Sequence, residues 1–341
     1  MADYLLANTD YEIYGMIRRT SKPDLGNLKK ALSNPRFKVV IGDLSDSVSI
    51  DNLVNEIKPD YFINLAAQSF VASSWHIPEQ TFDVDAIGVI RCLEAIRKHS
   101  PQCKFYGAGS SEEFGDVVFS PQTMEHPARA RSPYGAAKIA ARQITKVYRE
   151  SFNMYAIQGL LFNHESERRG EEFVTRKITL GVAKIHHAIK NDKFGFEPIE
   201  LGNLDAKRDW SHAEDFVEGI WLMLNQENPK EYLFSSNETH SIREFIELAF
   251  AAAGIRGVWS NLTGKPEGEE YLLSDDGFLA TKRYVPLVRV NSKFYRPAEV
   301  SLLHGDSTAA RKELAWKPKN SFNDLVNRMV KSDIENYKAQ S

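Results

Sequence analysis

The sequence has few cysteines and no long apolar run. Its only cysteines are Cys92 and Cys103, and neither has companions at metal-ligand spacing. We therefore expect two buried, reduced thiols rather than a disulfide, which fits a reducing compartment. There is no run of about 18 apolar residues and no signal-peptide pattern, so we expect a cytoplasmic protein without a membrane span.

The sequence also lacks an excess of charge of either sign. The 43 Lys and Arg residues nearly balance 46 Asp and Glu residues, which leaves a net charge of −3. This balance gives no electrostatic reason to expect a nucleic-acid or membrane partner. With 42% hydrophobic and 26% charged residues, the composition is ordinary for a globular protein, and 341 residues predict one or two domains.

Apolar runs and helical patterns alternate through the first half of the chain. Strands are predicted at 12–17, 37–42, 61–67, 104–108 and 155–162, with helices at 49–57, 82–99 and 134–152 between them. This order predicts an α/β fold with a doubly wound, parallel Rossmann-type sheet and a smaller, mixed C-terminal lobe. We expect a first domain of residues 1–163 with about 205–235, and a second of 164–204 with 236–341.

A glycine-rich phosphate loop is missing from the beginning of the sequence. The first predicted strand, 12–17, leads to Arg18 and behaves like the second strand of a doubly wound sheet, whose first strand normally precedes a Gly-rich turn. We expect Met1 to be a truncated or misassigned start. The alternatives are that the fold closes the gap or that another element fills it. Direct pairing of 12–17 with 61–66 would contradict the truncation.

A cluster of chemically active residues lies between residues 109 and 138. Tyr134 and Lys138 are four residues apart at the start of a predicted helix, so they share a face, and this is the only Tyr-x-x-x-Lys in the chain. An ammonium beside a phenol favours the phenolate, so we expect the pKa of Tyr134 to fall from about 10. Ser110 and Glu112 follow the strand 104–108. The alternative is that Ser110 caps a turn and Glu112 is a solvated loop carboxylate.

Longer strings are specific enough to indicate a family. They are Gly42–Leu44, Asn64–Ser69, Ser111-Glu112, Arg131–Lys138, Phe162–Ser166, Arg168–Gly170, Phe173–Lys177, Leu201–Trp210 and Tyr295–Val300. Over almost its whole length the chain resembles the GDP-mannose 4,6-dehydratases of the extended short-chain dehydrogenase/reductase superfamily. The resemblance implies conversion of GDP-D-mannose to GDP-4-keto-6-deoxy-D-mannose and water, with NADP as the cofactor and a homo-oligomer (dimer or tetramer) as the assembly.

The resemblance also implies roles for individual residues. Tyr134, beside Lys138, would accept the C4 hydroxyl proton, Glu112 would remove the C5 proton, and Ser110 with Glu112 would protonate the departing C6 hydroxyl. The implied cofactor-binding residues are Arg18, Arg19, Thr20, Ser21, Asp43, Leu44, Leu65, Ala66, Ala67, Gln68, Ser69, Lys138, His164 and Arg169. The implied substrate-binding residues are Asn163, Lys177, Arg208, Arg296 and Glu299.

The sequence departs from the family pattern at three side chains near the site. Ser110 replaces a threonine and keeps the hydroxyl, whereas Phe114 and Gln80 each replace a tyrosine. An epimerase or reductase of the same superfamily would share Tyr134 and Lys138 but would not need Glu112. A further alternative is a non-catalytic protein. Because the Gly-rich loop is missing, the chain would then be an inactive remnant that binds a GDP-sugar.

Overall fold

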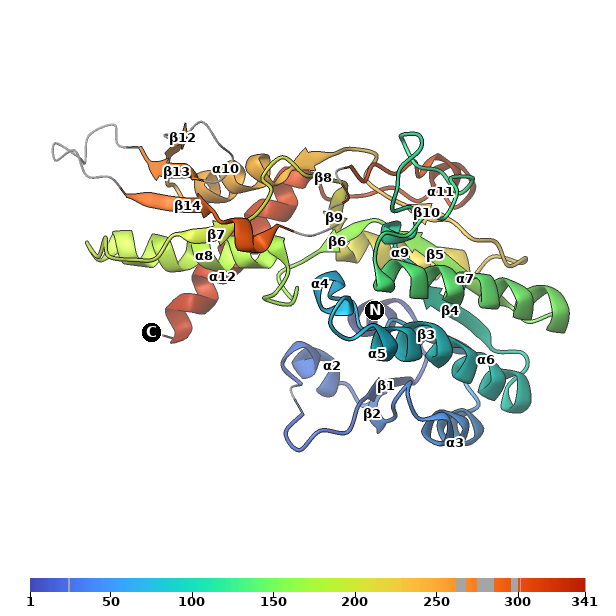
Figure 1. The fold of residues 1–341 in the computed structure, drawn as a ribbon. Helices are drawn as coiled ribbons and strands as arrows, with labels where there is room; N and C mark the ends of the chain where they lie inside the picture. Colours follow the sequence, from blue (N-terminus) through green and yellow to red (C-terminus); the bar gives the residue numbers. More distant parts are fainter. Residues whose placement is uncertain (24, 262–267, 275–284, 296–299, 301, 341) are drawn as a thin grey trace. The chain divides into compact units, whose positions relative to one another are not determined.

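The chain forms two compact units (Figure 1). The computed structural model describes residues 1–23, 25–261, 268–274, 285–295, 300 and 302–340. Unit 1 consists of Met1–Phe162, Ala213–Ser236 and Gly305–Lys317, and unit 2 consists of Asn163–His212, Asn237–His304 and Pro318–Ser341.

The unit boundaries differ from the predicted domain boundaries in two segments. Residues 305–317 were expected in the C-terminal lobe but join unit 1, because Trp316 packs edge-on against Phe234 with ring centroids 4.9 Å apart. The indole N–H of Trp316 also donates to the Asp215 carbonyl oxygen over 2.7 Å. Residues 205–212 were expected in the first domain but join unit 2, where β9 (Trp210–His212) pairs with β6 (Asn163–Glu165).

Unit 1 contains the alternating strands and helices that the sequence predicts. Its strands are β1 (Ile13–Ile17), β2 (Phe37–Ile41), β3 (Tyr61–Asn64), β4 (Lys104–Ala108), β5 (Ala156–Leu161) and β10 (Leu233–Phe234). Its helices are α1 (Ala2–Asn8), η1 (Gly26–Leu28), α2 (Lys29–Leu32), α3 (Ser47–Ile57), α4 (Val71–Ser74), α5 (Pro78–Phe82), the π-helical η2 (Asp83–Ile87), α6 (Gly88–His99), η3 (Ser111–Glu113), α7 (Pro133–Phe152), α9 (Ala213–Leu224) and α11 (Thr308–Glu313).

Helices cover both faces of the parallel strands in unit 1. Successive strand residues point to opposite faces, so Phe105 packs with residues of α3, α6 and α7, whereas the neighbouring Tyr106 packs with residues of α9 and with Trp316. All six residues of β5 are buried, as expected for a strand covered on both sides. The prediction of a doubly wound parallel arrangement is confirmed.

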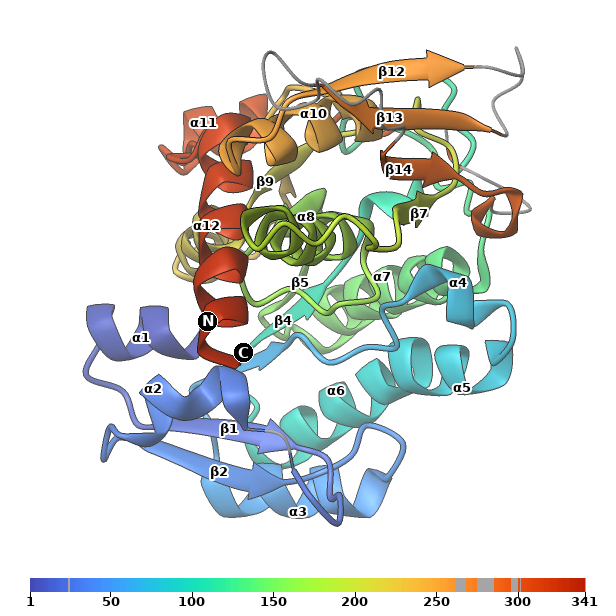
Figure 2. The ribbon, with the colours of Figure 1, turned by 90° about the vertical axis from the view of Figure 1, so that its left-hand side faces the viewer.

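The parallel strands of unit 1 form two separate ladders. β1 pairs with β2, and the second ladder has the order β10-β5-β4-β3. Figure 2 shows the β1–β2 pair apart from β4 and β5. Within the described residues, β1 and β3 do not pair with each other, so the structure does not support direct pairing of residues 12–17 with 61–66.

Unit 2 is a mixed α/β unit with its own core. Its strands are β6, β9, β7 (Ile199–Leu201), β8 (Lys207–Arg208), β11 (His240–Ser241), β12 (Gly257–Asn261), β13 (Glu269–Leu273) and β14 (Pro286–Val290), and its helices are α8 (Val174–Lys190), α10 (Ile242–Ala252), η4 (Ser292–Phe294) and α12 (Phe322–Gln340). The largest sheet has the order β12-β13-β14-β7. Trp210 stacks on Phe322 with centroids 5.8 Å apart and joins the core between α8, α10 and α12.

Candidate active site

The loop after β4 holds Ser110 and Glu112 in a helix cap. Ser110 is the N-cap of η3, and its Oγ accepts the N–H of Glu112 over 3.2 Å. In return, the N–H of Ser110 donates to Oε1 of Glu113 over 3.0 Å. A Cβ on Gly109 would lie 2.7 Å from the Gly159 carbonyl oxygen, so a side chain at this position would force the loop away from β5. The cap therefore fixes Ser110 and Glu112 on one short turn.

The first turn of α7 packs directly against that loop. Ser132 caps the helix by accepting the N–H of Gly135 over 3.1 Å. A Cβ on Gly135 would lie 2.6 Å from the carbonyl oxygen of Glu112, so glycine permits the close approach of the helix to the turn. Tyr134 and Lys138 lie on this first part of α7, and both are buried.

Lys138 is anchored to the end of β4. Its Nζ donates to the Ala108 carbonyl oxygen over 2.9 Å and lies 5.6 Å from the centroid of the Tyr134 ring. The Ser110 side chain is a hydrogen-bond partner of Tyr134. The structure thus brings all four predicted catalytic residues together around the carboxyl end of β4, where parallel sheets place their ligands.

The predicted fall in the pKa of Tyr134 is wrong. Burial raises the pKa of the Tyr134 phenol above its usual value, although the hydrogen bond to Ser110 partly opposes this change. Burial likewise lowers the pKa of the Lys138 ammonium, while Asp85 and Glu113 act in the opposite direction. The sequence spacing gave the proximity of the two side chains correctly, but it contained no information about their desolvation.

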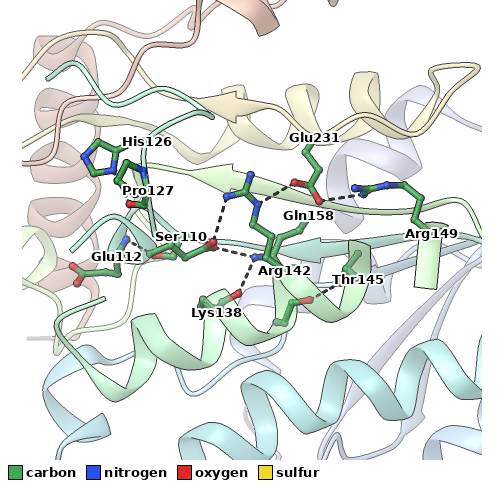
Figure 3. Close-up of polar contacts among 12 residues, drawn as sticks. Ser110, Glu112, His126, Pro127, Lys138, Arg142, Thr145, Arg149, Gln158 and Glu231 are labelled. Atoms are coloured by element: carbon green, nitrogen blue, oxygen red, sulfur yellow. Dashed lines mark hydrogen bonds and ion pairs between the residues drawn. The ribbon is translucent and has the colours of Figure 1, made fainter. Parts of the chain in front are cut away.

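A buried polar network lies beneath the loop (Figure 3). Gln158 Nε2 donates to Glu113 Oε1 over 2.9 Å and to the Lys138 carbonyl oxygen over 3.1 Å. Arg142 Nη1 lies 4.0 Å from Glu113 Oε2, and its Nε donates to Glu231 over 3.0 Å. Burial raises the pKa of Glu113 to about 7. Sequence reasoning missed Glu113, because nothing in the pattern distinguishes a buried Glu113 from an exposed one.

Asp85 is a second buried carboxylate that sequence reasoning missed. It lies in the π-helical turn η2, and its Oδ1 accepts the N–H of Gln68 over 2.7 Å. Burial raises the pKa of Asp85, and the charge of Lys138 acts to lower it. Oδ2 of Asp85 and Oε1 of Gln68 are buried without a hydrogen-bond partner among the described residues. Asp85 thereby interacts both with the loop after β3 and with Lys138, the predicted catalytic lysine.

The residues predicted to bind the adenosine end follow the carboxyl ends of β1 and β2. Arg18, Arg19, Thr20 and Ser21 are exposed after β1, and after β2 Asp43 is half-buried and Leu44 is buried. Asp43 accepts the N–H of Ser45 over 2.9 Å, and this bond, with the charges of Arg18 and Arg91, holds the pKa of Asp43 below its usual range. Arg18 and Asp43 are therefore neighbours.

The residues predicted to contact the middle of the dinucleotide follow β3. Of these, Leu65, Ala66 and Ser69 are exposed, whereas Ala67 and Gln68 are half-buried.

The other predicted site residues belong to unit 2. Asn163 and His164 lie on β6, and the Arg169 guanidinium lies 3.4 Å from the Phe173 ring centroid and forms a 3.1 Å ion pair with Glu165. Their cofactor and substrate roles stay predictions.

Two predicted diphosphate cations of unit 2 are at least half-buried. Lys177 Nζ lies 3.6 Å from the Phe294 ring centroid, and burial lowers its pKa. Arg208 is buried on β8 and donates to the Lys207 carbonyl oxygen over 2.9 Å. Arg296 and Glu299 lie outside the described residues.

The described residues contain neither a metal-binding cluster nor a membrane-spanning helix. No group of three or more His, Cys, Asp or Glu side chains is arranged to hold a metal ion. No helix in that part of the chain has both the length and the apolar character needed to cross a membrane.

Known structures show which kind of protein has this fold. A dTDP-glucose 4,6-dehydratase from Streptomyces venezuelae matches with a TM-score of 0.78 at 18% identity, covering 99% of this chain and 92% of that one. A UDP-glucose 4-epimerase from Thermotoga maritima matches with a TM-score of 0.77 at 18% identity, covering 99% and 94%. The chain thus has the same overall fold as this dehydratase and this epimerase, both of which act on nucleotide sugars by their names.

Sequence comparison narrows this class to one family. The sequence profile of GDP-mannose 4,6 dehydratase matches residues 1–329. A GDP-mannose 4,6 dehydratase of Drosophila melanogaster is 44% identical over 98% of this chain and 82% of its own length, and one of Homo sapiens is 42% identical over 98% and 88%. A GDP-mannose 4,6-dehydratase of Vibrio cholerae is 41% identical over 98% and 90%.

The chain belongs to the GDP-mannose 4,6-dehydratase family. The resemblance stated from the sequence motifs is therefore confirmed, as is the predicted class of enzyme, a nucleotide-sugar dehydratase. The roles of the individual site residues stay predictions.

Proposed function

We propose that this chain converts GDP-D-mannose to GDP-4-keto-6-deoxy-D-mannose and water, with Ser110, Glu112, Tyr134 and Lys138 as its catalytic residues. The observation that supports this most directly is the position of Glu112. It lies on the Ser110-capped turn, where its carbonyl oxygen is within van der Waals distance of α7 at Gly135, the residue after Tyr134. Epimerases and dehydratases of this kind both use the Tyr/Lys pair, but a dehydratase also needs a base that removes the C5 proton, and a carboxylate beside the pair can supply it.

The residues of unit 1 fit NADP, the cofactor of the family, at both ends. The exposed guanidinium groups of Arg18 and Arg19, with Thr20 and Ser21, suit the 2′-phosphate, because guanidinium forks bind dianions well. Asp43 and Leu44 would flank the adenine. The buried, unpartnered oxygens of Gln68 and Asp85 offer acceptors on the Lys138 side, within the described residues.

Further cofactor contacts are proposed from the family pattern. Leu65, Ala66, Ala67, Gln68 and Ser69 would contact the middle of the dinucleotide, and His164 and Arg169 the nicotinamide side. When bound, NADP would take a hydride from the sugar and later return it, so that no net oxidation occurs.

The side chains of unit 1 would then transfer protons at C4, C5 and C6 of the sugar. Tyr134 accepts the proton of the sugar C4 hydroxyl, assisted by the Ser110 hydrogen bond, which favours the ionised phenol. The resulting 4-keto group acidifies the C5–H bond, and Glu112 removes that proton. Glu112 with Ser110 then delivers a proton to the C6 hydroxyl, so the C6–O bond breaks with loss of water. When the hydride is returned to C6, C5 must regain a proton and Tyr134 must give up the one that it took from the C4 hydroxyl, which yields the 4-keto-6-deoxy product and restores the side chains.

The GDP moiety is assigned to residues of unit 2. We assign the diphosphate to Lys177 and Arg208 and, outside the described residues, Arg296, because cations suit its charge. Glu299, also outside the described residues, would accept from guanine N–H groups, and Asn163 would contact the sugar or the phosphates.

Replacement of Glu112 by glutamine tests this assignment. Glu112→Gln keeps the size of the side chain but removes the base, so kcat for dehydration should fall by about 10²–10⁴-fold while GDP-mannose and NADP binding persist. Exchange of the C5 hydrogen with solvent deuterium should be lost in parallel. Glu125→Gln, at an exposed position of the same loop, is the control. Undiminished dehydration by Glu112→Gln would overturn the proposal.

The competing functions give different results. An epimerase or reductase would tolerate Glu112→Gln, because neither reaction removes the C5 proton to expel water. A non-catalytic GDP-sugar-binding protein would bind GDP-mannose but would neither purify with NADP nor bind it on addition. Measuring the NADP content of the purified chain, and its NADP affinity, separates this possibility from the dehydratase.

Location and assembly complete the proposal. We assign the protein to the cytoplasm because Cys92 and Cys103 are both buried and free, which fits a reducing compartment. The predicted homo-oligomer stays a prediction.

A further inference from the structure

Two buried polar side chains connect the two halves of the proposed active site. Gln158 lies on β5, and its Nε2 donates both to Oε1 of Glu113 over 2.9 Å and to the Lys138 carbonyl oxygen over 3.1 Å (Figure 3). The same Oε1 of Glu113 accepts the N–H of Ser110 over 3.0 Å. Three hydrogen bonds in series therefore join the turn that begins at Ser110 to the helix that carries Lys138.

Water is excluded from the place where these two side chains meet. Glu113 and Gln158 are each 1% exposed. A Cβ on Gly109 would lie 2.8 Å from Oε1 of Glu113 and 2.9 Å from Nε2 of Gln158, so glycine at this position leaves the space that their hydrogen bond needs. Because solvent does not reach this space, water cannot easily replace either partner if one of them is lost.

The charge of Glu113 does not account for its presence here. Removing a carboxylate from water is unfavourable, and burial raises the pKa of Glu113 to about 7. The nearest cation, Arg142 of α7, keeps its Nη1 4.0 Å from Oε2, which has no hydrogen-bond partner among the described residues. The Nε of Arg142 instead donates to Glu231 over 3.0 Å. The use of Glu113 therefore lies in the bonds that Oε1 accepts rather than in a strong ion pair.

The proposed chemistry requires the two elements that these bonds join to keep a fixed spacing. Tyr134 is proposed to act at C4 of the sugar and Glu112 at the adjacent C5, yet Tyr134 lies on α7 and Glu112 on η3. A displacement of about 1 Å between reacting groups can cost about 10²-fold in rate. The close contact at Gly135 limits how near the two elements can come, but only directional bonds also keep them from sliding or separating.

We propose that Glu113 and Gln158 form a positioning pair, which holds the turn of Ser110 and Glu112 in register with the first turns of α7. This inference rests on the catalytic roles proposed above. The pair acts through the main-chain groups of Ser110 and Lys138 and transfers no proton to the substrate. Since only Oε1 of Glu113 takes part, the carbonyl oxygen of a glutamine at this position can accept the same two bonds.

Variants of Glu113 separate positioning from packing and from acid–base chemistry. Glu113→Met removes the acceptor, and kcat for dehydration should fall about tenfold or more. KM for GDP-mannose should change little, because the GDP moiety is assigned to unit 2. Glu113→Gln keeps the acceptor, so kcat should stay within about twofold of the unaltered chain, with the same pH profile. Glu125→Met, at an exposed position of the following loop, is the control.

A double-mutant cycle tests whether the two side chains act as one unit. Gln158→Met removes the donor and should lower kcat to a similar extent. Because either change breaks the same connection, the double variant Glu113→Met/Gln158→Met should be about as slow as the slower single variant, not slower by the product of both effects. Gln143→Met, at an exposed position of α7, is the matched control. If a Met variant does not fold, Gln158→Asn, whose shorter amide cannot span both bonds, should lower kcat while Glu113→Gln does not.

The outcomes that would overturn the pair differ from those that would overturn the catalytic assignment. Undiminished kcat in Glu113→Met or in Gln158→Asn, a low kcat or a shifted pH profile in Glu113→Gln, or multiplicative losses in the double variant would overturn the positioning pair. If Glu112→Gln is inactive in the same assay, the catalytic assignment stands and only the pair is rejected. Full activity of Glu112→Gln would instead overturn the assignment on which the pair rests.

Discussion

The carboxylate of Glu113 accepts the backbone N–H of Ser110 over 3.0 Å while lying almost completely buried. Ser110, which we propose as a catalytic residue, is therefore held in place by a neighbouring buried acid. Gln158 bonds to the same oxygen over 2.9 Å. This arrangement has a consequence for the pH dependence of stability.

Stability should fall as pH rises through the titration of Glu113. Burial raises its pKa to about 7 from an ordinary value of 4.5, so the folded state holds more protons than the unfolded state between those values. The contribution of Glu113 to the free energy of unfolding therefore decreases between about pH 4.5 and about pH 7, and it stays constant above about pH 7. Glu113→Gln should flatten that slope in Tm measurements at pH 5 to 8. Glu79→Gln, at an exposed position of α5, should keep the wild-type slope; an unchanged slope in Glu113→Gln contradicts the prediction.

Gly135→Ala should reduce activity and stability together. Alanine in a helix interior is usually more stable than glycine by about 0.5–1 kcal/mol. At Gly135 the added Cβ would lie 2.6 Å from the Glu112 carbonyl oxygen, so the loop has to move away from α7. We expect kcat to fall at least tenfold and Tm to fall. Ala136→Gly, one residue along at an exposed position of the same helix, should lower Tm with kcat unchanged. A more stable, fully active Gly135→Ala would show that the close approach is not needed.

Lys138→Met should separate activity from stability. Removing a buried ammonium relieves its desolvation, so Tm should stay the same or rise. The ammonium that we propose to act beside Tyr134 is lost, and kcat for dehydration should fall by about 10²–10⁴-fold. Lys146→Met, on the exposed face of α7, provides the matched control and should change neither quantity greatly. A large loss of Tm with activity retained would assign Lys138 a structural role only.

Thr175→Val should destabilise unit 2. Thr175 Oγ1 donates to Oε2 of the buried Glu165 over 2.6 Å, and valine keeps the shape of threonine without the donor. Loss of this hydrogen bond to the buried carboxylate should lower the free energy of unfolding, measured by urea denaturation, by about 1–3 kcal/mol. Thr239→Val, at a half-buried position of the same unit, should lower it by less. Equal losses in the two variants would show that the Thr175–Glu165 bond contributes little.

The sequence predicted the parts of the structure that depend on local patterns. The strand at 104–108 matches β4, and the helix at 134–152 differs from α7 by one residue, because short apolar runs and helical spacing are local properties. The proximity of the four proposed catalytic residues was also predicted, because Tyr134 and Lys138 share a helix face and Ser110 and Glu112 follow a strand that ends beside that helix. The long strings after Asn163 identified the family, which the comparisons confirmed.

Only the tertiary structure decided which of these polar groups lose contact with water. Glu113 and Asp85 look like ordinary acids in the sequence, yet both are buried and their pKa values are raised, and the buried Tyr134 shifts opposite to the prediction. Desolvation depends on every layer packed around a group, and no local pattern encodes it. The separation of β1 from β3 was likewise visible only once the strands were placed, because strand pairing joins residues far apart in the chain.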